Sequence, residues 1–143
     1  MISPFSLEIL VNDQILFFER PYVVAHEWGH LAGFADESEA SFVGWLICLA
    51  GDDLSQYSAW LSLFPRLTRY LDQEEKADLW ASLDAGPTDD LRKVSERLRS
   101  SVPIVRRSAN RVYDQYLKAN RVERGIASYD EVVELILGSK AWK

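Results

Sequence analysis

Cysteine is nearly absent from this sequence. Cys48 is the single cysteine among 143 residues, which excludes an internal disulfide and a zinc cluster of thiolates. It lies in the apolar run FVGWLICLA, where we expect it to be a small, buried hydrophobic residue. The N-terminus lacks the basic region that precedes the apolar segment of a secretory signal, and no apolar run approaches the ~18 residues of a membrane span. We therefore expect the chain as given to be one soluble domain covering residues 1–143.

Basic residues are scarce in the first part of the chain. Residues 1–60 contain one, Arg20, against nine acidic residues, whereas residues 61–143 contain fifteen against thirteen. This balance disfavours a phosphate-binding surface in the first part and is compatible with a cation site there. Residues 106–124 contain six basic and two acidic residues. We interpret this segment as the solvated face of a helix, and we expect no nucleic-acid partner.

Histidine is also scarce, which makes the spacing of the two histidines informative. They are His26 and His30, in the pentapeptide HEWGH, and Glu27 directly follows the first. Residues four apart lie on one face of a helix, so both imidazoles can bind one metal ion. Glu27, one residue further round, is placed to act as general base toward a metal-activated water. Chance gives this arrangement roughly once in a thousand such sequences, so we favour a zinc site over two hydrogen-bonded core histidines.

The remaining pattern predicts a mostly helical domain of the α+β class, with a short strand or hairpin at its front. Alternation and β-branched content indicate a strand over residues 5–11 and a second over 15–19. Helical spacing, capping residues and Gly or Pro stops predict helices after them. We expect these over residues 22–32 (ended by Gly33), from Asp36 to Gly51, from Asp53 to a kink or break at Pro65, after the Asp72–Glu75 capping pair, over about 89–100, from Pro103 to about Asn120, and after the caps Ser128 and Glu131. Residues 84–90 are predicted to be a loop.

A catalytic zinc ion needs a third protein ligand and an open coordination position. Three acids after the histidine motif compete for the ligand role: Asp36, Glu37 and Glu39. Asp36 completes a metzincin-like His-Glu-x-x-His-x-x-Gly-x-x-Asp pattern. Glu37 begins Glu-x-x-Ala-Ser, which resembles the gluzincin arrangement, where a Glu on the following helix binds the metal and the polar residue four positions later braces the first histidine. Glu39 also fits the reciprocal arm of a capping box, and all three acids suit the first turn of a helix without any metal.

A longer stretch carries a family resemblance. VVAHEWGHLAGFADESEASF looks like the zincin segment of a little-characterised bacterial family of predicted membrane-anchored HExxH proteins, and the resemblance extends to residues 112–137. It implies His26, His30 and Glu37 as ligands of one Zn²⁺ and Glu27 as the base, in a minimal zincin-like fold. Family members place this domain after N-terminal transmembrane helices, which the chain as given lacks. Position 41, where an Asn or Asp is expected as the brace of the first histidine, holds a serine.

Two functions follow as hypotheses. The first is a zinc metallopeptidase that hydrolyses a peptide or protein substrate, with Glu27 as general base and acid. Tyr113 or Tyr116 is a candidate hydrogen-bond donor to the oxyanion, although both also fit packing positions on one amphipathic helix. The second is a binding or regulatory module that keeps the metal and the fold but does not turn over peptides. The intact Glu27 favours the peptidase, because a structural zinc site needs no base and is usually closed by four protein ligands.

Overall fold

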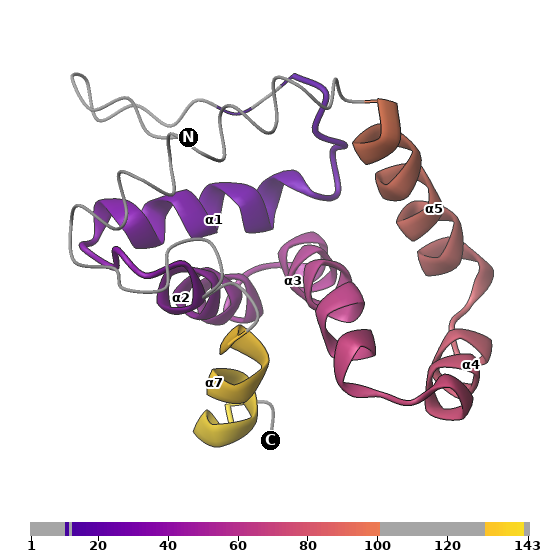
Figure 1. The fold of residues 1–143 in the computed structure, drawn as a ribbon. Coiled ribbons are helices and arrows are strands. Elements are labelled where there is room, and N and C mark those ends of the chain that lie inside the picture. The colour runs from indigo at the N-terminus through magenta and orange to yellow at the C-terminus, as the bar shows by residue number, and fades with distance from the viewer. Residues whose placement is uncertain (1–10, 12, 101–130, 142–143) are drawn as a thin grey trace.

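The computed structural model describes residue 11 and residues 13–100 and 131–141. Within these ranges it contains six α-helices, one short 3-10 helix and no strand, which confirms the prediction of a mostly helical fold. The helices are α1 (Arg20–Leu31), α2 (Glu37–Leu49), α3 (Asp53–Leu67), the 3-10 helix η1 (Thr68–Tyr70), α4 (Gln73–Ala81), α5 (Ala85–Ser100) and α7 (Val132–Ser139). Figure 1 shows α1 lying across α2 and α3, α7 beside α2, and α4 with α5 as an arm that continues from α3.

Residues 15–19, predicted to form a strand, instead form turns that lead into α1. The Glu19 N–H donates to the Leu16 carbonyl at 2.9 Å, and the Leu16 N–H donates to the Glu19 carboxylate at 3.1 Å. Phe18 is buried against side chains of α3 and α5. The strand prediction was wrong because helices distant in the sequence bury this apolar run. The local alternation of apolar and polar residues carries no information about such distant contacts. The other predicted strand, 5–11, lies outside the described residues apart from its last residue.

The end of α1 has the geometry that Gly33 predicts. Gly33 has a φ of 104°, a left-handed conformation that glycine adopts without steric cost. Its N–H donates to the His30 carbonyl at 3.0 Å, and the Phe34 N–H donates to the Gly29 carbonyl at 3.1 Å. These two bonds form a Schellman motif, which closes the helix and turns the chain back along its last turn. The backbone of Phe34 is thereby brought next to His30.

Two glycines let α1 and α2 approach closely. A Cβ on Gly29 would lie 3.1 Å from the Ala40 carbonyl oxygen, and a Cβ on Gly44 would lie 2.8 Å from the His26 backbone nitrogen. The second distance is too short for a real contact with backbone, so a side chain at Gly44 would force the helices apart. The backbones of α1 and α2 therefore meet at the first histidine of the motif.

Two hydrophobic clusters hold the described helices together. The larger joins α1, α2, α3 and α7 and consists of Tyr22, Ala25, Trp45, Cys48, Ala59, Leu63, Val132, Val133 and Ile136. The smaller joins the turn before α1 to α3 and α5 and consists of Phe18, Leu61, Phe64 and Leu91. Cys48 is buried, as expected, and burial, with the charge of Asp52, raises the pKa of its thiol to about 11.

Aspartate N-caps begin three helices near the predicted positions. Asp36, Asp52 and Asp72 accept backbone hydrogen bonds at the starts of α2, α3 and α4, and the capping box of Asp72 with Glu75 is complete. A kink or break was predicted at Pro65, and of these the break does not occur, because α3 continues to Leu67. A proline inside a helix removes one N–H donor, and the two residues before it, Leu63 and Phe64, are buried. None of the described helices is long and apolar enough to cross a bilayer.

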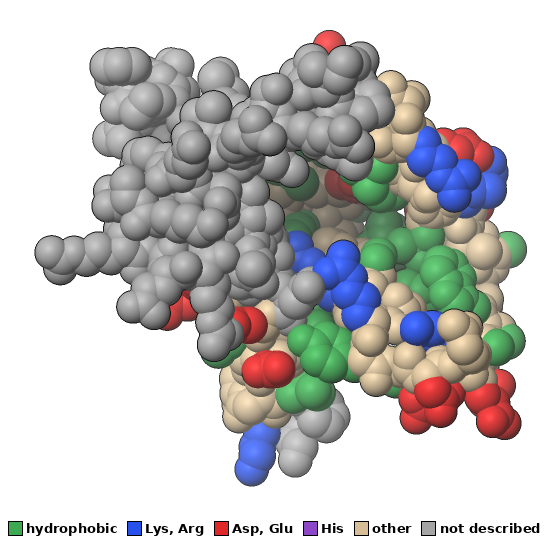
Figure 2. All heavy atoms as spheres, in the orientation of Figure 1, with side chains coloured by type: hydrophobic (Ala, Val, Ile, Leu, Met, Phe, Trp, Pro, Cys, Tyr) green, Lys and Arg blue, Asp and Glu red, His purple; other side chains and the backbone are tan. Residues whose placement is uncertain are grey.

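The loop predicted over residues 84–90 is also wrong, because α5 begins at Ala85. Gly86 and Pro87 fall in its first turn, where backbone N–H groups have no intrahelical acceptor, so proline loses no hydrogen bond there. The outer face of α5 carries acids and bases that pair along the helix, Arg92 with Asp89 and Glu96 and Lys93 with Asp89 and Asp90. Figure 2 shows acidic and basic side chains adjacent on this side of the molecule. The predicted charged helix is therefore present and longer than expected.

Candidate metal centre

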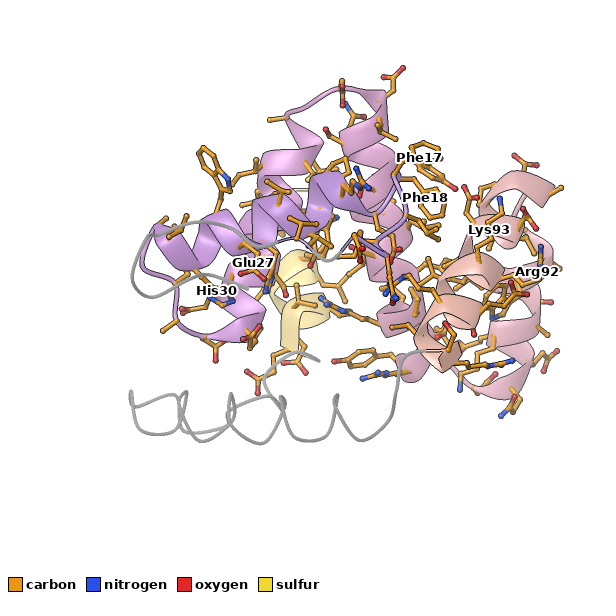
Figure 3. All side chains as sticks on the ribbon, turned by 90° about the horizontal axis from the view of Figure 1, so that it is seen from above. Phe17, Phe18, Glu27, His30, Arg92 and Lys93 are labelled. Atoms are coloured by element: carbon orange, nitrogen blue, oxygen red, sulfur yellow. The ribbon has the colours of Figure 1, made fainter. Side chains whose placement is uncertain are left out.

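The two histidines lie on one face of α1, as the HEWGH spacing predicts. Their Nε2 atoms are 3.1 Å apart, and their rings stand edge to face at 86°. Both side chains are almost buried, with exposed fractions of 12% for His26 and 11% for His30. Figure 3 shows Glu27 and His30 on the same part of α1, far from the paired rings of Phe17 and Phe18 near its other end. This part of α1 therefore directs two nitrogen donors to one point.

Contacts at Nδ1 determine which nitrogen of each ring faces that point. His30 Nδ1 is 2.8 Å from the Phe34 carbonyl oxygen. A carbonyl oxygen only accepts, so Nδ1 donates and a neutral His30 keeps its lone pair on Nε2. His26 Nδ1 is 3.2 Å from Ser41 Oγ, a hydroxyl that can accept the ring N–H. Both rings thus fit the tautomer that binds a metal through Nε2.

Glu37, in the first turn of α2, supplies a third atom that could bind a metal ion. Its side chain is fully buried, and its Oε2 lies 3.3 Å from His26 Nε2 and 3.6 Å from His30 Nε2. Asp36 is instead the N-cap and accepts from two backbone N–H groups of α2, while Glu39 is exposed. Within the described part of the chain, His26, His30 and Glu37 form the group that could hold a metal ion. Of the three competing acids, the structure brings Glu37 to the histidines.

The spacing of these donor atoms fits a tetrahedral metal ion. Zinc bonds of about 2.0–2.1 Å in a tetrahedral site imply ligand atoms about 3.3 Å apart. The three observed separations, 3.1, 3.3 and 3.6 Å, bracket that value. A buried carboxylate oxygen beside two imidazole nitrogens favours a cation at the point between them. Two imidazoles and one carboxylate are also a ligand set that zinc hydrolases use, with one position left for water. The residues present therefore fit a zinc ion.

The electrostatics of His30 reflect its acidic neighbours. Burial lowers the pKa of His30, but its contact with the Glu37 carboxylate, its hydrogen bond to the Phe34 carbonyl and the charges of Glu37 and Glu27 outweigh that effect, so the pKa is raised above its ordinary value. Glu27 thus lies close enough for its charge to act on His30 without belonging to the donor group. A general base requires such a position beside the ligands.

Some residues that contact the two histidines were predicted from the sequence, and others were not. Ser41 occupies the bracing position four residues after Glu37 and contacts the first histidine, as the gluzincin-like spacing suggests. The carbonyl of Phe34 was not anticipated, and its signal is the glycine stop, since a Schellman turn folds the next residue onto the helix. Tyr22, whose ring lies 6.4 Å from that of His26 and whose hydroxyl donates to the Ser41 carbonyl, was also not anticipated as a supporting residue. Its signal is the spacing of four residues before His26, which places both on one face of α1.

Several predicted features lie outside the described residues. These are the oxyanion candidates Tyr113 and Tyr116, the basic segment 106–124 and the helix expected from Pro103, all within residues 101–130. Their roles stay predictions.

Comparison with known proteins identifies a family but no activity. No curated protein and no solved structure matches the chain. A family model described as "Protein of unknown function (DUF3810)" matches residues 1–137. Because that match covers nearly the whole sequence, including the candidate metal centre, the chain belongs to the DUF3810 family.

Proposed function

We propose that this protein is a zinc-dependent metallopeptidase that binds one Zn²⁺ through His26, His30 and Glu37 and hydrolyses a peptide or protein substrate. The observation that carries the proposal is the convergence of three donor atoms at tetrahedral spacing, with Glu27 beside them. The resemblance to membrane-anchored HExxH proteins adds the expectation that the substrate is cleaved next to a membrane.

The chemistry divides between the metal and Glu27. A bound zinc ion supplies Lewis acidity, which lowers the pKa of water toward about 7 and polarises a carbonyl. Glu27 accepts a proton from the attacking water as the new carbon–oxygen bond forms. The same carboxyl group then donates that proton to the amine nitrogen as the carbon–nitrogen bond breaks. The products are a free carboxylate and a free amine, and Glu27 returns to its ionised form.

The second candidate is a module that keeps the metal without turning over peptides. Its support is the deep burial of the donor group, since the Glu37 side chain is fully buried and both imidazoles are almost so. A structural zinc site is buried in the same way. The two candidates make the same prediction for metal content and different predictions for Glu27.

Metal content is measured first. Protein purified without added zinc should contain about one equivalent of metal, lost in His26→Ala. Wild-type protein without metal would refute both candidates.

Activity is measured next, with a peptide library incubated with wild type, Glu27→Gln and the matched control Glu39→Gln. If the protein is a peptidase, Glu27→Gln retains its zinc and loses about 10²–10⁴-fold of its activity, while Glu39→Gln cleaves as wild type does. Zinc-loaded wild type that cleaves nothing beyond what Glu27→Gln cleaves would establish the non-catalytic module.

A further inference from the structure

Tyr22 connects three helices directly behind the metal centre. It lies one turn before His26 on the same face of α1 and is buried, with 8% of its surface exposed. Its backbone N–H donates to Ser58 Oγ of α3 at 3.1 Å, and its phenolic O–H donates to the Ser41 carbonyl of α2 at 3.4 Å. The same phenol oxygen accepts from Arg66 Nη1 of α3 at 3.3 Å.

The backbone contact has a structural reason. The first N–H groups of a helix have no intrahelical acceptor, and Glu19, the N-cap of α1, makes no side-chain capping bond. Ser58 Oγ accepts the N–H of Tyr22 in its place. The first turn of α1 is thereby fixed to α3, and this contact does not involve the phenol.

The phenol contact leads to the metal centre. The backbone carbonyl of Ser41 accepts a hydrogen bond from the Tyr22 hydroxyl. The side-chain hydroxyl of Ser41 lies 3.2 Å from His26 Nδ1. The position of the Ser41 hydroxyl against the ring therefore depends on where Tyr22 holds the Ser41 backbone. Arg66 strengthens this hold, because a cation that donates to a phenol oxygen makes its O–H a better donor.

We infer that Tyr22, supported by Arg66, is a positioning residue of the metal centre: its hydroxyl fixes Ser41 on α2 against His26 on α1. This inference rests on the proposed function, since it assumes that His26 binds the metal. Residues that hold a metal ligand commonly change metal affinity by 10–100-fold when they are removed. Tyr22 acts one contact further away, so we expect its effect at the lower end of that range.

The experiment uses Tyr22→Phe, which keeps the buried ring and removes the hydroxyl. Zinc affinity is measured by competition with a chelator, and ligand geometry by the visible absorption of the cobalt(II)-substituted protein. Tyr22→Phe should bind zinc about tenfold more weakly and shift the cobalt bands. The matched control is Tyr57→Phe, which removes a phenol bonded to Asp90 at 2.8 Å, outside the donor group. It should leave both measurements unchanged.

A double-mutant cycle tests the route of the effect. Ser41→Ala removes the contact with His26 but keeps the carbonyl that Tyr22 binds. If Tyr22 acts through Ser41, Tyr22→Phe should weaken zinc binding in the wild-type background and cause no further loss in the Ser41→Ala background.

Three outcomes overturn the inference. They are wild-type zinc affinity and cobalt spectrum in Tyr22→Phe, an equal loss in Tyr57→Phe, and an equal loss from Tyr22→Phe in both backgrounds. In these cases the proposed function stands, because wild type still binds metal. A wild-type protein that binds neither zinc nor cobalt overturns the proposed function as well.

Discussion

Glu37 places a carboxylate in a fully buried position against two imidazoles, and under the proposed function its negative charge is what binds the zinc ion. In Glu37→Gln the amide keeps nearly the same shape and lacks the negative charge. Zinc affinity should fall more than about 100-fold, beyond the loss expected for a group that only supports a ligand. The measurement is a chelator competition, with circular dichroism to confirm that the variant is folded.

The control for this prediction is Glu39→Gln, two residues further along α2. Glu39 is exposed and lies outside the donor group, so this variant should bind zinc as wild type does. If Glu37→Gln and Glu39→Gln bind zinc equally well, Glu37 is not a ligand.

At the residue scale the sequence predicted the local part of the site directly, whereas Glu37 was favoured among three acids by its gluzincin-like spacing and by the family resemblance. His26, Glu27 and His30 follow from helix periodicity alone, which fixes residues four apart on one face. The choice among Asp36, Glu37 and Glu39 depends on how α2 packs on α1, and this packing is not a local property. The structure favours Glu37 because Asp36 is used as the N-cap and Glu39 points to solvent.

The packing of α1 on α2 sets the metal centre at the element scale. In Gly44→Ala the new Cβ would lie 2.8 Å from the His26 backbone nitrogen, so the helices must separate. We expect a loss of about 1–3 kcal/mol in the unfolding free energy of the metal-free protein and weaker zinc binding, because His26 moves away from Glu37. Urea unfolding and chelator competition measure the two effects.

Gly86→Ala is the matched control, because it changes a helical glycine whose Cβ would meet no atom within 4 Å. It should stabilise the protein by about 0.4–1 kcal/mol, since alanine restricts the unfolded chain, and leave zinc affinity unchanged. Unaltered zinc affinity in Gly44→Ala would show that the close approach of α1 and α2 does not position the ligands.

The contact between α3 and α5 gives a pH prediction. The pKa of Tyr57 is raised from 10 to about 12 by its burial, by its hydrogen bond to Asp90 and by the negative charge of Asp90. Because the folded-state pKa is the higher one, the contribution of Tyr57 to stability is complete below pH 10 and is lost as the pH rises toward 12. Wild type should therefore lose stability more steeply than Tyr57→Phe above pH 10, in urea unfolding at a series of pH values. If the unfolding free energies of the two proteins change with pH in parallel above pH 10, the pKa of Tyr57 is not raised.

Helix boundaries show where sequence patterns were sufficient. Gly33 and the Asp72–Glu75 pair were interpreted correctly, because Schellman turns and capping boxes depend on a few neighbouring residues. The loop predicted over 84–90 was wrong, since Gly and Pro occur both in loops and in the first turn of a helix. The strand predicted over 15–19 was wrong because Phe18 is buried by α3 and α5, far away in the sequence.

At the scale of the whole molecule, the described chain divides into a part that carries the candidate metal centre and an arm. The larger cluster joins α1, α2, α3 and α7. The arm of α4 and α5 is attached through the smaller cluster and through a two-bond ion pair from Arg97 to Glu19, with N–O distances of 2.7 and 3.1 Å. Since the metal donors come from α1 and α2, zinc should stabilise the first part more than the arm.

Hydrogen exchange with and without zinc tests this division. Free zinc at 100 times its dissociation constant adds about 2.7 kcal/mol to any opening that breaks the site. Amides of α1 and α2 should therefore exchange up to about 100-fold more slowly with zinc present, while those of α4 and α5, which can open without disturbing the site, change little. His26→Ala should show no effect of zinc in any helix. Equal slowing in all described helices would instead mean that the arm unfolds together with the part that carries the candidate metal centre. In that case Arg97 and the smaller cluster would couple α5 to the centre as firmly as α2 is coupled to it.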